Sequence, residues 1–300
     1  MDDPTPATWE LTEDAQSFLD AASGVLAADP VLGTVVATTA QRLADRAGRG
    51  EPAPEHPHWF AVARDGAGQV AGVAMRTAAT PPHQAYLMPA DTRLAESLAD
   101  LLIARGEVVD AANGALDTAR AFVERVRRRT GGTLTVVRPS RLYELGTLTS
   151  PDRTPAGAPR PARPADLELA HRWFGDFVPD AERQAGRTSA ATDAPDRDTV
   201  GGRIAAGQLW CWETDGEPVS MVGFLGPALG VARVAPVFTP AVHRGRGYAG
   251  ALVAHVSALL RDAGHRVCLF TDLENPVSNA LYARLGYEPV VDMAELRIVP

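Results

Sequence analysis

The stretch that decides the fold is an apolar run followed by a glycine-rich turn, and it reads Val231-Ala-Arg-Val-Ala-Pro-Val-Phe238, Thr239-Pro-Ala-Val-His243, Arg244-Gly-Arg-Gly-Tyr-Ala-Gly250. The run predicts a strand, and the apolar spacing after the turn predicts an amphipathic helix over about 246–263. Glycines let backbone N–H groups approach an anion closely, and the first turn of a helix adds a favourable dipole. Arg244 and Arg246 add positive charge. The sequence therefore predicts an anion-binding turn with a pyrophosphate as its natural guest.

The glycine-rich turn allows two other interpretations. It can be a tight turn without any ligand. Gly245, Gly247 and Gly250 also match a dinucleotide-binding fingerprint, and Asp272 follows at a compatible distance. In that fingerprint the strand runs almost directly into the first glycine, whereas here residues 239–244 intervene and include a proline. A nucleotide-dependent oxidoreductase is therefore rejected.

The rest of the second half predicts a mixed α/β sheet with helices on both faces. Helices are expected at about 165–178, 197–206, 246–263 and 276–285, and strands at about 208–214, 218–226, 230–238, 266–271 and 289–298.

The two halves of the chain resemble each other. Asp65-Gly66 and Asp215-Gly216 each lie between two apolar runs, which predicts a β-hairpin in each half. Five prolines in residues 147–164 predict a linker, because proline lacks a backbone donor and fixes φ. The last residues of this segment could form an edge strand of the second domain. We therefore expect tandem domains of related fold at 1–150 and 151–300.

Bulk composition limits the classes of function. A net charge of −8 argues against nonspecific nucleic-acid binding. The two cysteines, Cys211 and Cys268, lie far apart without a CxxC pair, so we expect no zinc site and no bound metal. No apolar run is long enough to span a bilayer, and the acidic, proline-containing start is unlike a secretory signal. We expect a cytoplasmic protein without membrane or nucleic-acid partners, and a homodimer is left open.

The second half resembles the GNAT superfamily of CoA-dependent N-acetyltransferases. One signature of that family matches Arg244, Gly247 and Ala249, and a second matches Asn275, Tyr282, Gly286 and Tyr287. The resemblance implies GNAT-like domains, each with a central, mostly antiparallel sheet flanked by helices. In the first half the corresponding loop, Met88-Pro-Ala-Asp-Thr-Arg-Leu94, lacks glycine, and Phe122 stands near the position of the tyrosine. That half is expected to be a degenerate, non-catalytic copy.

The resemblance also implies roles for individual residues in binding acetyl-CoA, the cosubstrate. The pantetheine arm would pair with the backbone of Val237, Phe238 and Thr239, and Asn275 would contact the same arm. The pyrophosphate would lie on the N–H groups of Arg244, Gly245, Arg246, Gly247, Tyr248 and Ala249. A backbone N–H near Phe238 could stabilise charge on the thioester oxygen.

The chemistry implied is direct attack of a neutral amine on the thioester, which needs a base and an acid. Tyr282 stands at the family's acid position, and the alternative is a core tyrosine. For the base we select Glu213, with Asp176, Glu182, Asp272 or a water chain as alternatives. Five aromatic residues could form an acceptor wall or belong to the core: Trp173, Phe174, Phe177, Trp210 and Trp212.

The expected function is therefore transfer of an acetyl or other acyl group from acetyl-CoA to a primary amine of a small molecule or peptide. The alternative is a noncatalytic CoA-binding or protein-interaction module with the same fold.

Overall fold

The computed structural model describes residues 7–151, 153–187 and 194–300. The chain forms two compact units. Unit 1 comprises Met1–Ser140 together with Val291–Pro300, and unit 2 comprises Arg141–Val290. The structural division thus lies about ten residues before the expected boundary at 150, and the last ten residues belong to the first unit.

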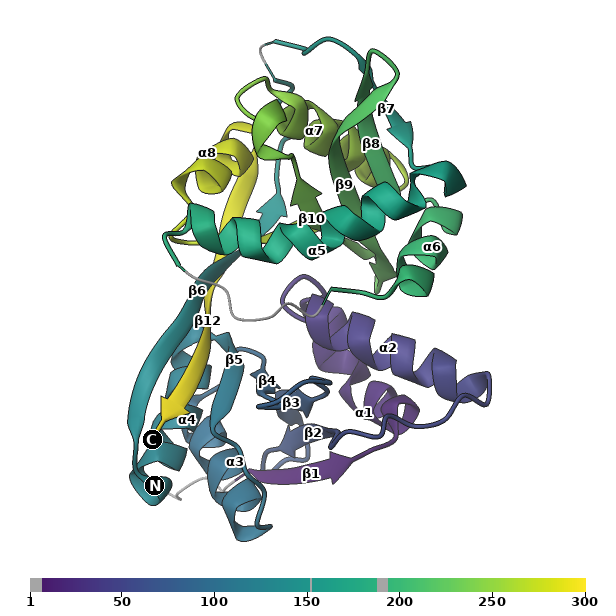
Figure 1. The fold of residues 1–300 in the computed structure, drawn as a ribbon. Helices are drawn as coiled ribbons and strands as arrows, with labels where there is room; N and C mark the ends of the chain where they lie inside the picture. The colour runs from purple at the N-terminus through teal and green to yellow at the C-terminus, as the bar shows by residue number, and fades with distance from the viewer. Residues whose placement is uncertain (1–6, 152, 188–193) are drawn as a thin grey trace. The chain divides into compact units, whose positions relative to one another are not determined.

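Unit 1 is an α/β unit that contains both strands and helices (Figure 1). Its elements are β1 (Thr8–Thr12), α1 (Ala15–Ala28), α2 (Thr34–Gly48), β2 (Trp59–Arg64), β3 (Val70–Arg76), β4 (Ala85–Leu87), α3 (Thr92–Ala104), β5 (Ala111–Ala115), α4 (Leu116–Thr130) and the first part of β6 (Thr133–Leu145).

Unit 2 repeats this order of elements. It contains β7 (Ala158–Pro161), α5 (Leu167–Gln184), α6 (Arg197–Ala205), β8 (Leu209–Thr214), β9 (Glu217–Ala228), β10 (Val231–Phe238), α7 (Tyr248–Asp262), β11 (Arg266–Asp272), α8 (Pro276–Arg284) and the first part of β12 (Tyr287–Val299). Each unit therefore runs strand, two helices, three strands, helix, strand, helix and strand. The expected tandem arrangement of two α/β domains with mixed sheets is confirmed.

The hairpin of unit 2 forms as its sequence dictates. Asp215 and Gly216 both adopt positive φ, at 51° and 81°, and Thr214 pairs with Glu217. A two-residue turn of this kind matches the twist of the flanking strands. In unit 1 the turn is longer, because the Asp65 carboxylate accepts from the N–H groups of Ala67 and Gln69, both at 2.9 Å.

Helices cover both faces of the unit 2 sheet, and alternate residues of each strand point to opposite faces. Leu209, Cys211 and Met221 pack with residues of α5 and α6 in one core cluster. Trp212 and Val222 pack with residues of α7 and α8 in the other. Burial of these apolar faces holds α5 and α7 against β10, which is the strand that borders the site described below.

The last strand explains the structural division of the chain. In unit 1 the sheet order is β1-β2-β3-β4-β5-β12, and β12 pairs antiparallel with β5 from Met293–Ala115 to Arg297–Ala111. In unit 2 the order is β6-β11-β10-β9-β8-β7. The sheet of unit 1 thus contains part of β12 from the second half of the sequence, and the sheet of unit 2 contains part of β6 from the first half. Composition and linker signals do not reveal this exchange.

Within the described ranges, no helix has the length and apolar character needed to cross a membrane.

Candidate functional site

The site begins where two parallel strands of unit 2 separate. β10 and β11 pair from Val231–Arg266 to Arg233–Cys268, and the remaining residues of β10 continue beyond this register. On its other edge β10 stays paired with β9 as far as Phe238–Met221. The wedge between the strands opens into a cavity of about 500 Å³ whose wall includes both Val234–Phe238 and Phe270–Asp272. One edge of β10 is therefore available to an extended ligand.

The amino end of α7 forms one wall of the same cavity. Gly247 caps the helix in a left-handed conformation with φ 87°, and Gly245 has φ 73°. No side chain caps the helix, and its first intrahelical bond runs from Ala251 N to Gly247 O at 3.0 Å. The N–H groups of Tyr248 and Ala249 consequently have no acceptor within the helix. A Cβ added at either glycine would meet no heavy atom within 4 Å, so an anion has room to reach the backbone.

Most of the residues selected from the sequence lie together on this cavity wall. They are Val237, Phe238, Thr239, Arg244, Gly245, Gly247, Tyr248, Ala249, Asn275 and Tyr282. Arg246 lies in the same loop, but its side chain is exposed and is not part of the wall.

Tyr282 lies on α8 and is 7% exposed. The centroid of its ring lies 5.9 Å from that of Tyr287 in an edge-on arrangement, and the Tyr287 hydroxyl is hydrogen-bonded to the Ser257 hydroxyl at 2.7 Å. Burial raises the pKa of the Tyr282 phenol, because a phenolate would lose its hydration. The phenol therefore keeps its proton through the neutral pH range.

Glu213 does not lie on the wall of this cavity. It is on β8, and the sheet order places β9 between β8 and β10. Its carboxylate pairs with Arg160 of β7, which also binds Asp166 at 2.7 Å. The position of Glu213 thus favours a structural ion pair at the edge of the sheet over a role as base.

The other carboxylates considered as bases are also held or remote. Asp272 lines the cavity but pairs with Arg187, which also binds Glu182 at 2.6 Å. Asp176 is exposed on α5 and lies off the wall.

The proposed aromatic wall is mostly core. Of the five residues considered, only Phe177 borders the cavity. Trp173 and Phe174 are buried between α5, α6 and the sheet. Trp212 donates to the carbonyl of Ala156 at 2.8 Å, and the Trp210 ring lies 4.9 Å from the His255 ring.

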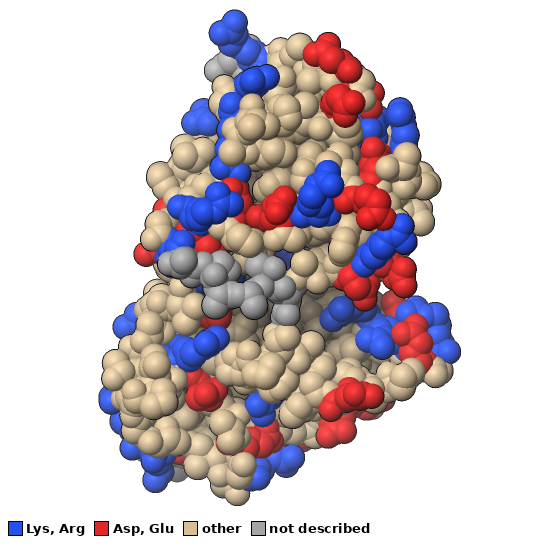
Figure 2. All heavy atoms as spheres, in the orientation of Figure 1, with Lys and Arg blue, Asp and Glu red and all other residues tan. Residues whose placement is uncertain are grey.

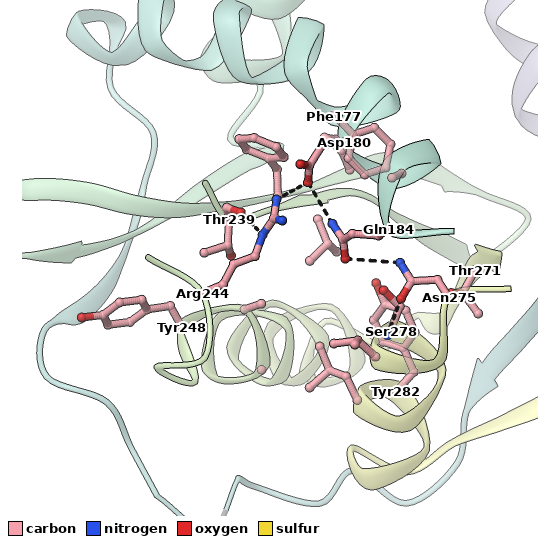
Figure 3. A pocket seen from close by; sticks show the side chains of 18 of the residues that line it. Phe177, Asp180, Gln184, Thr239, Arg244, Tyr248, Thr271, Asn275, Ser278 and Tyr282 are labelled. Atoms are coloured by element: carbon pink, nitrogen blue, oxygen red, sulfur yellow. Dashed lines mark hydrogen bonds and ion pairs between the residues drawn. The ribbon is translucent and has the colours of Figure 1, made fainter. Parts of the chain in front are cut away.

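A polar chain across the cavity was not indicated by the sequence motifs (Figure 3). Arg244 pairs with Asp180 of α5, Gln184 Nε2 donates to Asp180 at 2.8 Å, and Asn275 Nδ2 donates to Gln184 Oε1 at 3.4 Å. Asn275 also caps α8 by accepting from Ser278 N at 3.1 Å. The one sequence signal for these polar contacts is the spacing of Asp180 and Gln184, which places the two side chains on the same helix face.

On the face drawn in Figure 2, acidic and basic side chains of each unit are interspersed. Among the described residues, no group of three or more His, Cys, Asp or Glu could hold a metal ion.

Comparison with known proteins places this geometry in context. Residues 170–287 match the family described as Acetyltransferase (GNAT) family. A search of curated proteins finds no match.

Solved structures share the fold over almost the whole chain. A GNAT-family acetyltransferase from Colwellia psychrerythraea is 12% identical with a TM-score of 0.59, covering 97% of this chain and 100% of its own. A GCN5-related N-acetyltransferase from Sphaerobacter thermophilus is 17% identical with a TM-score of 0.58, covering 96% and 95%. A fungal GH3 β-N-acetylglucosaminidase with a GCN5-related glucosamine N-acetyltransferase region is 13% identical with a TM-score of 0.52, covering 97% of this chain and 38% of its own. At these identities the likeness concerns the fold alone.

Proposed function

We propose that unit 2 transfers an acetyl group from acetyl-CoA to a primary amine of a small molecule or peptide, because residues 170–287 match the GNAT acetyltransferase family. The family supports acyl transfer from acetyl-CoA in general. The choice of an amine acceptor and the roles of single residues are the finer part of the proposal.

One observation carries the proposal. A free edge of β10, the uncapped amino end of α7 and the buried phenol of Tyr282 all face a single cavity. A CoA thioester has an extended amide arm, a diphosphate and a sulfur leaving group, and these three features match the three parts of the wall.

The binding part of the proposal follows the backbone. The pantetheine amides pair with Val237 to Thr239, and Asn275 contacts the same arm. The diphosphate accepts hydrogen bonds from the N–H groups of the loop that ends in Gly247, Tyr248 and Ala249, where the helix dipole also favours negative charge.

The chemical step joins the amine nitrogen to the thioester carbon and breaks the carbon–sulfur bond. The electron pair leaves with sulfur, and Tyr282 gives its phenolic proton to the thiolate as it departs. The proton that the nitrogen loses as the amide forms restores the Tyr282 phenol. Burial keeps the phenol protonated at neutral pH, so the proton is present when the carbon–sulfur bond breaks.

The acceptor must lose one proton before it attacks, and we propose that water takes it. The two carboxylates of the described wall, Asp180 and Asp272, are both held in ion pairs with arginine.

The test measures acetyl-CoA binding by calorimetry and release of CoA thiol against a panel of amines. The panel contains polyamines, peptide amino termini and glucosamine, since one protein of similar fold carries a glucosamine N-acetyltransferase region. Thiol release that depends on an added amine is expected. Binding without turnover for any amine would favour the noncatalytic module, and no binding would refute the proposal.

A further inference from the structure

Asp180 is a buried carboxylate on the cavity wall that the proposed chemistry does not use. Its side chain is 7% exposed, and it lies on α5 opposite the diphosphate loop. It accepts from Gln184 Nε2 at 2.8 Å and lies 3.1 Å from Arg183 Nη2. Its third partner is Arg244, the first residue of the loop.

The guanidinium of Arg244 is directed toward protein atoms. Its Nε donates to the carbonyl of Thr239 at 2.9 Å, and its Nη2 pairs with Asp180. In Figure 3 the side chain of Arg244 points from the loop toward Asp180 on α5. The loop arginine that lies on the cavity wall is thus already neutralised.

Few other cations can take its place. Arg246 is exposed and lies off the cavity wall, and the remaining arginine on the described wall, Arg284, comes from the far end of α8. Because the diphosphate of CoA is strongly anionic, a buried carboxylate near its loop has two effects. It repels the ligand directly, and it withholds the one loop arginine that reaches the wall.

We propose that Asp180 sets the CoA affinity of the site by holding Arg244 in an ion pair that the diphosphate must break. This inference rests on the proposed function of unit 2. Arg244 exchanges one anion for another when CoA binds, so the net gain from its charge is small. The backbone N–H groups of the loop then supply most of the diphosphate affinity.

The exchange has a kinetic consequence. When CoA leaves after acetyl transfer, Arg244 can form its ion pair with Asp180 of α5 again. Product release limits the turnover of many enzymes, and a competing carboxylate accelerates it. Asp180 is therefore an affinity-determining residue that acts through Arg244.

The test compares the dissociation constant of CoA for the full chain and for Asp180→Asn, using calorimetry at several salt concentrations. The amide keeps the shape of the side chain but releases Arg244, so we expect about tenfold tighter binding, the gain of one charge-assisted contact to phosphate. The log–log dependence of the constant on salt should also become steeper, because one more exposed cation meets the ligand.

The matched control is Glu168→Gln, which changes the net charge by the same amount on the same helix. Glu168 pairs with Arg197 and its side chain is 68% exposed, away from the cavity. It should leave both the constant and its salt dependence unchanged. If Asp180→Asn does not fold, as judged by circular dichroism, Asp180→Ser undergoes the same comparison.

The outcomes are distinct. Unchanged or weaker CoA binding by a folded Asp180 variant would overturn the inference while leaving the proposed function in place. An equal gain in the Glu168 control would reduce the effect to net charge and would also overturn the inference. Failure of the unaltered chain to bind CoA would overturn the proposed function and the inference together.

Discussion

Strands β4 and β5 of unit 1 and strands β10 and β11 of unit 2 occupy the same place in the order of elements, and each pair is joined over three residues, but only β10 continues well beyond its last pair. β4 pairs with β5 along its whole length, from Ala85–Ala112 to Leu87–Gly114. At that last pair, a Cβ on Gly114 would lie 2.1 Å from the carbonyl oxygen of Leu87. β4 thus ends at this pair, whereas β10 continues from Val234 to Phe238 past its last pair with β11 and borders the wedge.

The helices that follow these strands differ in their caps. In unit 1, Asp91 caps α3, and its carboxylate accepts from Arg93 N at 2.7 Å. In unit 2, Gly247 caps α7 without a side chain. An aspartate at this position uses a backbone donor and repels an incoming phosphate, whereas a glycine leaves the donors free.

The third difference concerns the last helix of each unit. Phe122 on α4 is fully buried in the apolar core, while Tyr282 on α8 borders a cavity. Unit 1 therefore keeps the order of elements of unit 2. It differs in having no strand that continues past the pairing, an acidic helix cap, and a phenylalanine where unit 2 has the phenol. Function therefore has to be argued from each site and not from the shared fold.

The largest expected effect comes from removing the uncapped helix end of unit 2. Gly247→Asp gives α7 the acidic cap that α3 already has, so CoA binding should weaken by about 100-fold or more, because backbone contacts are lost and like charges meet. Calorimetry measures the constant.

Gly230→Asp is the matched control, since Gly230 also has positive φ, at 76°, with open space around it. Both variants should remain folded with a similar loss of stability. Equal CoA binding by the Gly247 variant and its control would break the comparison between the two caps.

The next effect concerns the phenol. Tyr282→Phe makes unit 2 resemble unit 1 at this position and removes the proton donor, so kcat should fall about 100-fold while KM for acetyl-CoA changes much less. Steady-state thiol release measures both constants. Tyr287→Phe removes a neighbouring hydroxyl that bonds Ser257 and lies off the cavity wall, and it should lower stability more than kcat. An unaltered kcat for the Tyr282 variant would contradict its role as acid.

The smallest effect is expected in unit 1. Asp91→Ala removes the cap of α3 and should lower the free energy of unfolding by about 1 kcal/mol. It should create no CoA binding, because β4 ends at its last pair with β5 and offers no free strand edge to the ligand. Thermal unfolding and calorimetry check the two parts. A second binding event in this variant would show that the cap alone closes the site of unit 1.

Local signals in the sequence predicted much of this comparison. The Asp215-Gly216 turn, the glycine-rich loop and the apolar spacing of α7 are determined by neighbouring residues, and so is the missing glycine in unit 1. Contacts between distant segments were not predictable in this way. The pairing of β12 with β5 joins residues about 180 positions apart, and no local pattern encodes such a register.

The candidate site divides along the same line. The end of β10 and the glycine-rich loop, which the motifs singled out, border one cavity. Glu213 illustrates the opposite case, because no motif links it to Arg160, its ion-pair partner on the edge strand β7. Asp180 carries no motif at all, and only the packing of α5 against the loop reveals its contact with Arg244.

The central claim is that the chain holds one CoA site and that it lies in unit 2. Calorimetric titration of the full chain with CoA, repeated with Gly247→Asp, tests it most directly. The account predicts one CoA per chain for the unaltered protein and binding weaker by about 100-fold or more for the variant. Two molecules bound per chain, or one bound with unchanged affinity in the variant, would contradict it.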